Sequence, residues 1–121
     1  MANQKWYNVM SKKINVLFYK TDAGNEPVRE WLLDLDEVDR KTIGVDIKTV
    51  EYGWPIGMPV SRPLGKGLYE VRSNISNRRI ARVIFTIVEH YMILLNGFVK
   101  KTQKTPKEEI ALALKRAKEI K

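Results

Sequence analysis

Three segments typical of β-strands follow one another in the second half of the chain, with only short connections between them. They are residues 68–73 (LYEVRS), 80–88 (IARVIFTIV) and 91–99 (YMILLNGFV), each rich in β-branched, aromatic or aliphatic residues. Glu89-His90 is short enough for a tight hairpin turn. Neighbouring strands joined by such short connections pair in antiparallel order. The sequence therefore predicts an antiparallel meander.

A strand and two helices are predicted before this meander. Residues 14–19 are β-branched and aromatic, as in a strand. Apolar residues then recur at i, i+3, i+4 and i+7 from Val28 to Leu35, and Pro27 suits a first helical turn. A second helix is predicted over 38–52, with Gly53 and Pro55 ending it.

The segment between the helices and the meander is predicted to be an ordered loop. Residues 53–67 are rich in glycine and proline, and Trp54 is favoured as a packing anchor over a base-stacking platform. A last helix is predicted after residue 105, where Thr105, Pro106 and Glu108 fit a capping box. Together these patterns predict an α+β fold: an antiparallel sheet of about four strands, two N-terminal helices and a C-terminal helix.

The composition excludes several kinds of catalytic centre. The 121 residues include no cysteine and one histidine, His90. Thiolate zinc sites, iron–sulfur clusters, cysteine nucleophiles and histidine-rich metal sites are therefore excluded, and no metal or other cofactor is expected. His90 falls at a predicted turn and is expected to be a surface residue. No apolar run approaches the roughly 20 residues that span a bilayer, so a soluble cytoplasmic protein is expected.

Positive charge is concentrated in the second half of the chain. Residues 1–60 carry 8 Lys and Arg against 9 Asp and Glu, whereas residues 61–121 carry 14 against 5. Such asymmetry favours a polyanionic partner, although basic surfaces also serve solubility. Nucleic acid is favoured over a membrane, because the basic residues mostly flank strands and do not line a long amphipathic helix.

Five charged residues are the best candidates for chemistry. Alternation along the strand at 68–73 places Glu70 and Arg72 on the same face. Arg82 lies in an apolar strand, where an arginine is costly unless it is paired or the sheet face is open to solvent. Lys100 and Lys101 come at the end of the last strand. A meander can bring all five to one face, either as an active site or as a structural network of ion pairs.

The second half of the chain also resembles a known family. The runs PLGKGLYEVRSN, RRIARVIFTI and LLNGFVKKTQKTPKEEIALALKRAKE resemble the phage-derived, HigB-type toxins of the RelE/ParE superfamily over about residues 60–121. The strand–helix–helix order at 14–52 agrees with that superfamily. The resemblance implies a compact RelE-like fold in a single toxin domain, residues 1–121. It also implies a toxin that cleaves mRNA on the ribosome and forms a hetero-oligomeric complex with a HigA-like helix-turn-helix antitoxin.

Residue roles are implied by the same resemblance. Arg72 and Arg82 match sheet residues that face the scissile phosphate, and Lys100 and Lys101 match a basic pair after the last strand. The chain departs from some relatives at Glu70, a candidate general base, where they carry a basic residue. It also lacks the tyrosine that some relatives place early in the last helix. Four further basic residues are expected to contact RNA: Arg79, Lys66, Lys104 and Lys107.

The chemistry expected from these residues is cleavage of RNA without a metal. The 2′-hydroxyl attacks the neighbouring phosphorus while the 5′-oxygen leaves, assisted by a base, an acid and cations. Arginine suits the cationic role because guanidinium offers a rigid fork of donors. Two other functions are compatible with the sequence: ParE-like inhibition of DNA gyrase, and non-catalytic binding of nucleic acid.

Overall fold

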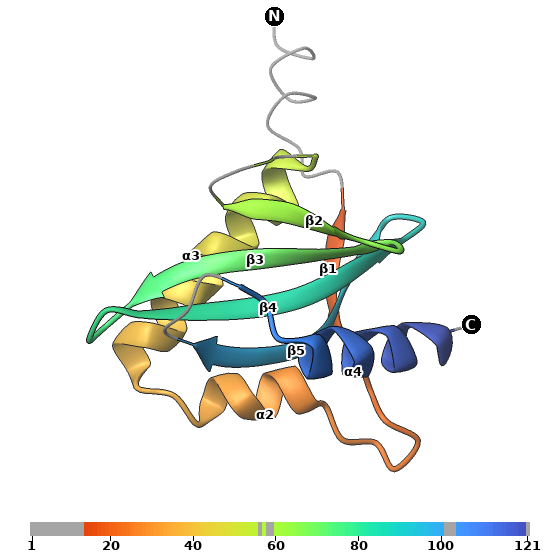
Figure 1. The fold of residues 1–121 in the computed structure, drawn as a ribbon, viewed down its shortest axis with the longest axis horizontal. Coiled ribbons are helices and arrows are strands. Elements are labelled where there is room, and N and C mark those ends of the chain that lie inside the picture. Colours follow the sequence, from red (N-terminus) through yellow and green to blue (C-terminus); the bar gives the residue numbers. More distant parts are fainter. Residues whose placement is uncertain (1–13, 56, 58–59, 101–103, 121) are drawn as a thin grey trace, which may run out of the picture.

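The computed structural model of the chain has an α+β fold, as predicted (Figure 1). It describes residues 14–55, 57, 60–100 and 104–120. Along the chain, one strand and two helices precede four strands and a final helix. These elements are β1 (Asn15–Phe18), α2 (Pro27–Leu33), α3 (Glu37–Gly53), β2 (Ser61–Gly65), β3 (Leu68–Ile75), β4 (Arg79–Val88), β5 (Tyr91–Lys100) and α4 (Lys107–Lys118). Within the described ranges, no helix is long and apolar enough to cross a membrane.

The sheet has five strands and is mixed, which corrects the prediction of about four antiparallel strands. Its order is β1-β5-β4-β3-β2. The predicted meander of β3, β4 and β5 is antiparallel. The first strand, however, lies beside β5 in parallel, with Asn15 opposite Tyr91 and Phe18 opposite Leu94. No short connection sets the direction of this pair, because two helices and three strands separate β1 from β5 in the sequence.

A second correction concerns β2, which lies in the segment predicted to be a loop. Ser61–Gly65 pairs with β3 in antiparallel order at the edge of the sheet. Pro63 lacks a backbone N–H, and an edge strand is where a sheet tolerates this loss. The turn to β3 uses positive φ angles at Gly65, Lys66 and Gly67, which glycine adopts readily. The proline and glycine content therefore conceals a strand with its hairpin turn.

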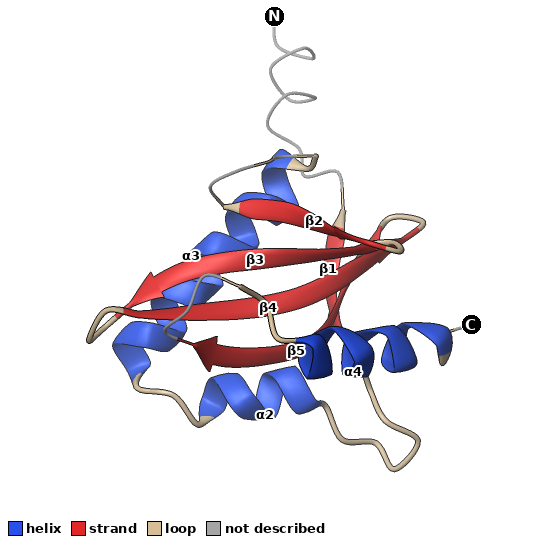
Figure 2. Cartoon of the chain, viewed as in Figure 1, coloured by secondary structure: helices blue, strands red, loops and turns tan. Residues whose placement is uncertain are grey.

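Helices cover both faces of the sheet (Figure 2). The face toward α2 and α3 forms one core, in which Val28 and Trp31 of α2 and Ile43 and Val50 of α3 meet the strands. The face toward α4 forms a second core. Three apolar residues of α4 pack there, namely Ile110, Leu114 and Ala117. The apolar spacing from Val28 to Leu35 thus predicts correctly which side of α2 packs inward.

Gly97 of β5 lies directly against the side chain of Trp31 in α2. A Cβ atom at this position would lie 2.5 Å from Cε3 and Cζ3 of Trp31. Gly97→Ala is therefore expected to lower the free energy of unfolding by about 1–3 kcal/mol through overpacking, measured by urea denaturation. Gly44→Ala is the control, since that Cβ would meet nothing within 4 Å. In the middle of α3, alanine is expected to raise stability by up to about 1 kcal/mol. Equal effects of the two changes would contradict the prediction.

Candidate functional site

Strand register gathers four charged residues on the sheet face that α4 partly covers. Arg62 of β2 lies opposite Glu70 of β3. Two residues along β3, Arg72 lies opposite Arg82 of β4. Directly paired residues point to the same face, and so do residues i and i+2 of one strand. The alternation that predicted a shared face for Glu70 and Arg72 therefore extends over three strands.

The carboxylate of Glu70 is the centre of this group. It is wholly buried, as is Arg82. Its Oε1 lies 3.2 Å from Nη1 of Arg82 and 3.0 Å from Nε of Arg62. Its Oε2 accepts a hydrogen bond of 2.6 Å from the hydroxyl of Thr105. Both oxygens of Glu70 are thus engaged inside the protein, in the buried ion-pair network that the sequence left as an alternative to an active site.

Thr105 belongs to this network and does not cap α4, which corrects the predicted capping box. The helix starts at Lys107, its N-cap residue is Pro106, and no side chain caps it. The Thr105 side chain is buried instead, and its Oγ1 accepts hydrogen bonds from Arg82 (2.9 Å) and Arg62 (3.3 Å) while donating to Glu70. A buried carboxylate and two guanidinium groups outcompete a backbone N–H for this hydroxyl.

The network carries more positive than negative charge. We call it the arginine network, because it contains one carboxylate, Glu70, and three arginines, Arg62, Arg72 and Arg82. Burial lowers the pKa of Arg82 from its ordinary value, the charges of Arg72 and Arg62 lower it further, and the charge of Glu70 opposes them. Arginine nevertheless stays protonated in proteins because its ordinary pKa lies far above neutral pH. The sheet face therefore has a net excess of cations around one shielded carboxylate.

Around this buried group, several predicted residues reach the surface. Arg72 is half-buried, and Lys100, at the end of β5, is exposed. Lys100 lies opposite Ile80, two residues from Arg82 along β4, so it belongs to the same sheet face. Lys104 and Lys107 are exposed on either side of Thr105. Solvent therefore reaches the network at Arg72, and the three exposed lysines add cations around it.

Two residues predicted to bind RNA lie elsewhere. Lys66 is exposed in the β2–β3 turn, roughly 15 Å along β3 from Arg72. Arg79 begins β4 on the opposite face, where its Nη2 lies 2.8 Å from Oδ2 of Asp39 in α3. Lys101, a further predicted site residue, lies outside the described residues.

The ion pair of Arg79 is part of a clamp between α3 and the β3–β4 turn. Asp39 also accepts hydrogen bonds from the backbone N–H (3.1 Å) and the hydroxyl (2.9 Å) of Ser76. The pKa of Asp39 is lowered below its ordinary value, although burial opposes this shift. The hydrogen bond from the Ser76 backbone N–H makes the largest contribution to the lowering, and the Ser76 hydroxyl and Arg79 contribute less.

This lowered pKa predicts an acid-sensitive contribution to stability. A carboxylate whose pKa is lowered in the folded state stabilises the fold at pH values above its unfolded-state pKa of about 3.9. This stabilisation is lost as the pH falls through the folded-state pKa. Asp39→Asn is expected to be less stable than the wild type at pH 7 and to lose less stability between pH 5 and pH 2, measured by urea denaturation. Parallel pH profiles for the two proteins would contradict this expectation.

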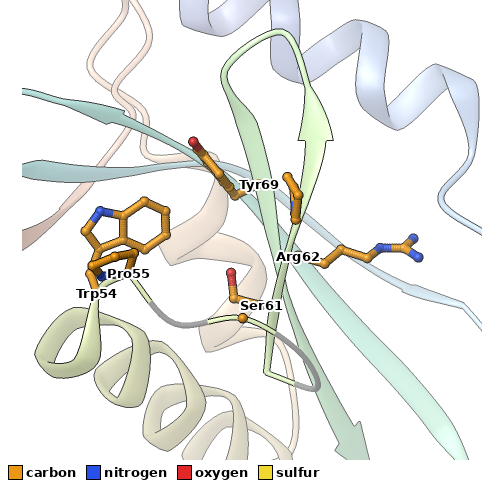
Figure 3. Close-up of a pocket in the computed structure, with 7 residues that line it drawn as sticks. Trp54, Pro55, Ser61, Arg62 and Tyr69 are labelled. Atoms are coloured by element: carbon orange, nitrogen blue, oxygen red, sulfur yellow. The ribbon is translucent and has the colours of Figure 1, made fainter.

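His90 and Trp54 lie as predicted. His90 is exposed in the β4–β5 turn, roughly 20 Å or more along β4 from Arg82. Trp54 packs edge-on against Tyr69 and Phe85, with ring centroids 5.0 and 5.7 Å away. Figure 3 shows the pocket beside this tryptophan, from which the side chain of Arg62 points away. Trp54 is thus a packing anchor on the face opposite the arginine network.

Sequence reasoning missed Arg62 and the role of Thr105. Arg62 was hidden because its strand was interpreted as a loop. The Gly65-Lys66-Gly67 run was a usable signal, since a short glycine-containing connection before a strand indicates a hairpin. For Thr105 the local pattern pointed to a cap, and only the tertiary fold supplies its partners. Among the described residues, no group of three or more His, Asp or Glu could hold a metal ion.

Comparison with known families adds one finding. The model of the family described as phage-derived protein Gp49-like (DUF891) matches residues 30–118. This range runs from within α2 to the end of α4 and contains every residue of the arginine network. No curated protein sequence matches the chain.

Proposed function

The chain belongs to the family of phage-derived Gp49-like proteins, and from this membership we propose that it is the toxin of a type II toxin–antitoxin pair. The proposed activity is ribosome-dependent cleavage of mRNA without a metal, as in the HigB-type toxins that its second half resembles. The observation that carries the proposal is the cationic sheet face, where three arginines surround one buried carboxylate.

The charge of this face favours an RNA phosphate as its ligand. Glu70 offsets only one of the three arginines, and the nearby Lys100, Lys104 and Lys107 add exposed cations. Phosphate contacts from Arg and Lys dominate the affinity of proteins for nucleic acid. Positive charges fixed in position also stabilise the charge that develops on phosphorus during cleavage.

The proposed roles differ between buried and exposed residues. Arg72 and Lys100, and Lys101 by resemblance, contact the scissile phosphate or its neighbours. Arg82 and Glu70 act as positioning residues, because both are wholly buried and the carboxylate oxygens already have partners. In cleavage, the 2′-oxygen forms a bond to phosphorus and the bond to the 5′-oxygen breaks, giving a 2′,3′-cyclic phosphate and a 5′-hydroxyl. A base removes the proton of the 2′-hydroxyl, and an acid donates a proton to the leaving 5′-oxygen.

Dependence on the ribosome follows from the weakness of this chemistry. The single histidine of the chain lies far from the network, and the buried Glu70 is a poor candidate for a general base. Much of the rate must then come from holding the RNA in line for attack. In the proposal, the ribosome holds the mRNA in this geometry, and the cationic face of the toxin docks against it.

The test is to add the purified protein to a translating extract and to map mRNA 5′ ends by primer extension. New ends inside the reading frame are expected with ribosomes present, and none are expected on the same RNA without ribosomes. A folded protein that produces no new ends would overturn the proposal. If that protein instead blocks supercoiling by DNA gyrase, the ParE-like alternative takes its place.

A further inference from the structure

Helix α3 carries a second, outward-facing stripe in addition to its buried one. Ile43, Ile47 and Val50 are buried against the sheet. On the other side, Val38, Val45 and Tyr52 are 72%, 63% and 47% exposed. A surface helix of this kind normally presents charged and polar residues to solvent. Large apolar side chains aligned on the outer side therefore require an explanation.

The spacing of the outer stripe is that of a helix–helix contact. Thr42 and Thr49 lie between the three apolar residues, so the stripe recurs in steps of four and three residues: 38, 42, 45, 49 and 52. This is the heptad spacing by which one helix packs along another. Each threonine hydroxyl donates to a carbonyl of its own helix, at 3.1 Å to Val38 and 2.9 Å to Val45. A partner that covers this stripe would therefore leave neither threonine hydroxyl without an acceptor.

The charged residues beside the stripe indicate which kind of partner would bind it. Lys41 and Lys48 lie one heptad apart along one flank, where Lys41 also forms an exposed ion pair of 3.3 Å with Glu37, and Asp46 lies on the other flank. In an antiparallel pair of α3 helices, like flanks would meet and Lys41 would approach Lys48 of the second copy. The net charge of +8 adds to this repulsion. A second copy of the chain is therefore a poor occupant, whereas carboxylates would match the lysine flank.

We propose that the outer stripe of α3, from Val38 to Tyr52, is the docking surface for an acidic amphipathic helix of a partner protein. The stripe extends about 21 Å, or about four helical turns, at 1.5 Å per residue. A partner helix of similar length would place apolar residues against Val38, Val45 and Tyr52. Its Asp or Glu residues would lie along Lys41 and Lys48.

This surface is separate from the cationic face. Helix α3 packs against the face of the sheet opposite to α4 and to the arginine network (Figure 1). A helix bound to the outer side of α3 would therefore leave Arg72 and Lys100 open. The inference concerns a partner surface alone, and it holds whether or not the chain cleaves RNA.

Two synthetic helical peptides of about 15 residues, the length of the stripe at 1.5 Å per residue, test the proposal. Both carry a leucine seam, and the flanking positions are Glu in one and Lys in the other. Fluorescence anisotropy with the full chain is expected to show binding of the Glu peptide at least about tenfold tighter than binding of the Lys peptide. Higher salt should weaken that binding, because the flanking charges are exposed. No binding of the Glu peptide, or equal binding of both, would overturn the proposal.

Three variants locate the contact. Val45→Glu, at the centre of the stripe, is expected to weaken binding of the Glu peptide about tenfold or more. Joint Lys41→Glu and Lys48→Glu changes should reverse the preference between peptides. Leu112→Glu, an exposed apolar position on α4, is the matched control and should change Kd less than about twofold. Circular dichroism checks that each variant is folded.

Two results would overturn the assignment of this surface. Binding that is unaffected by Val45→Glu would place the peptide elsewhere on the protein. A dimer of the chain in sedimentation experiments that Val45→Glu dissociates would assign the stripe to a second copy. Neither result depends on RNA cleavage, so a failure of this inference is distinguishable from a failure of the proposed function.

Discussion

Replacing Glu70 by glutamine should lower the free energy of unfolding by about 3–5 kcal/mol, which is the usual cost of removing one partner from a buried ion pair. The substitution preserves size but removes the only carboxylate of the network, so the wholly buried Arg82 loses its counter-charge at 3.2 Å. Arg62 loses the same partner at 3.0 Å. Urea denaturation at pH 7, followed by circular dichroism, measures the loss.

A double-mutant cycle separates this explanation from a general loss of packing. Arg82→Met alone should also be strongly destabilising, because it leaves Glu70 buried with less compensation. Combining Glu70→Gln with Arg82→Met removes both charges of the pair, so its cost should be clearly smaller than the sum of the two single costs. Glu89→Gln, in the exposed β4–β5 turn, is the matched control and should change stability by less than about 0.5 kcal/mol. Additive losses in the cycle would contradict the ion-pair explanation.

Arg72→Ala should reduce ribosome-dependent mRNA cleavage about 100-fold or more, the typical cost of removing one group that stabilises charge in the transition state. Arg72 is the arginine of the sheet face that β3 presents beside the buried Arg82, and it is half-buried rather than enclosed. Primer extension on translated mRNA, as a time course, measures the cleavage rate.

Two companion variants make this result interpretable. Arg72→Lys keeps the charge but loses the planar fork, so it should recover only part of the activity. Arg29→Ala removes an exposed arginine from α2, on the other face of the sheet, and should leave the rate unchanged. Wild-type cleavage by a folded Arg72→Ala protein would remove Arg72 from the site. Equal losses in Arg29→Ala would indicate that overall charge, rather than position, determines activity.

Most elements could be predicted from local patterns, whereas two strand pairings could not. Apolar spacing and strand-like composition indicated all three helices and the meander of β3, β4 and β5. The edge strand at Ser61–Gly65 was missed because Pro63 and the glycines around it argue locally against a strand. The parallel pairing of β1 with β5 was missed because periodicity shows that a segment is a strand but not which strand lies beside it.

The candidate site, like the fold, could be predicted from local patterns only in part. Alternation was enough to place Glu70 and Arg72 on one face, and the cost of a buried arginine indicated that Arg82 needs a partner. The partners of Glu70, however, depend on cross-strand register and on the position of Thr105, 35 residues from Glu70. Such long-range partners are set by tertiary structure, which local sequence patterns do not encode.

The parallel pairing of β1 with β5 also determines when the protein can acquire its native state. Asn15 must find Tyr91, a partner 76 positions later in the sequence (91 minus 15). Closing so long a loop costs entropy before the contact repays it, and parallel pairing of this kind is intrinsically slow. During synthesis the N-terminal strand has no partner until β5 has been made. A nascent chain released before β5 is made would therefore lack the β1–β5 pair, and its cationic face would lack Lys100.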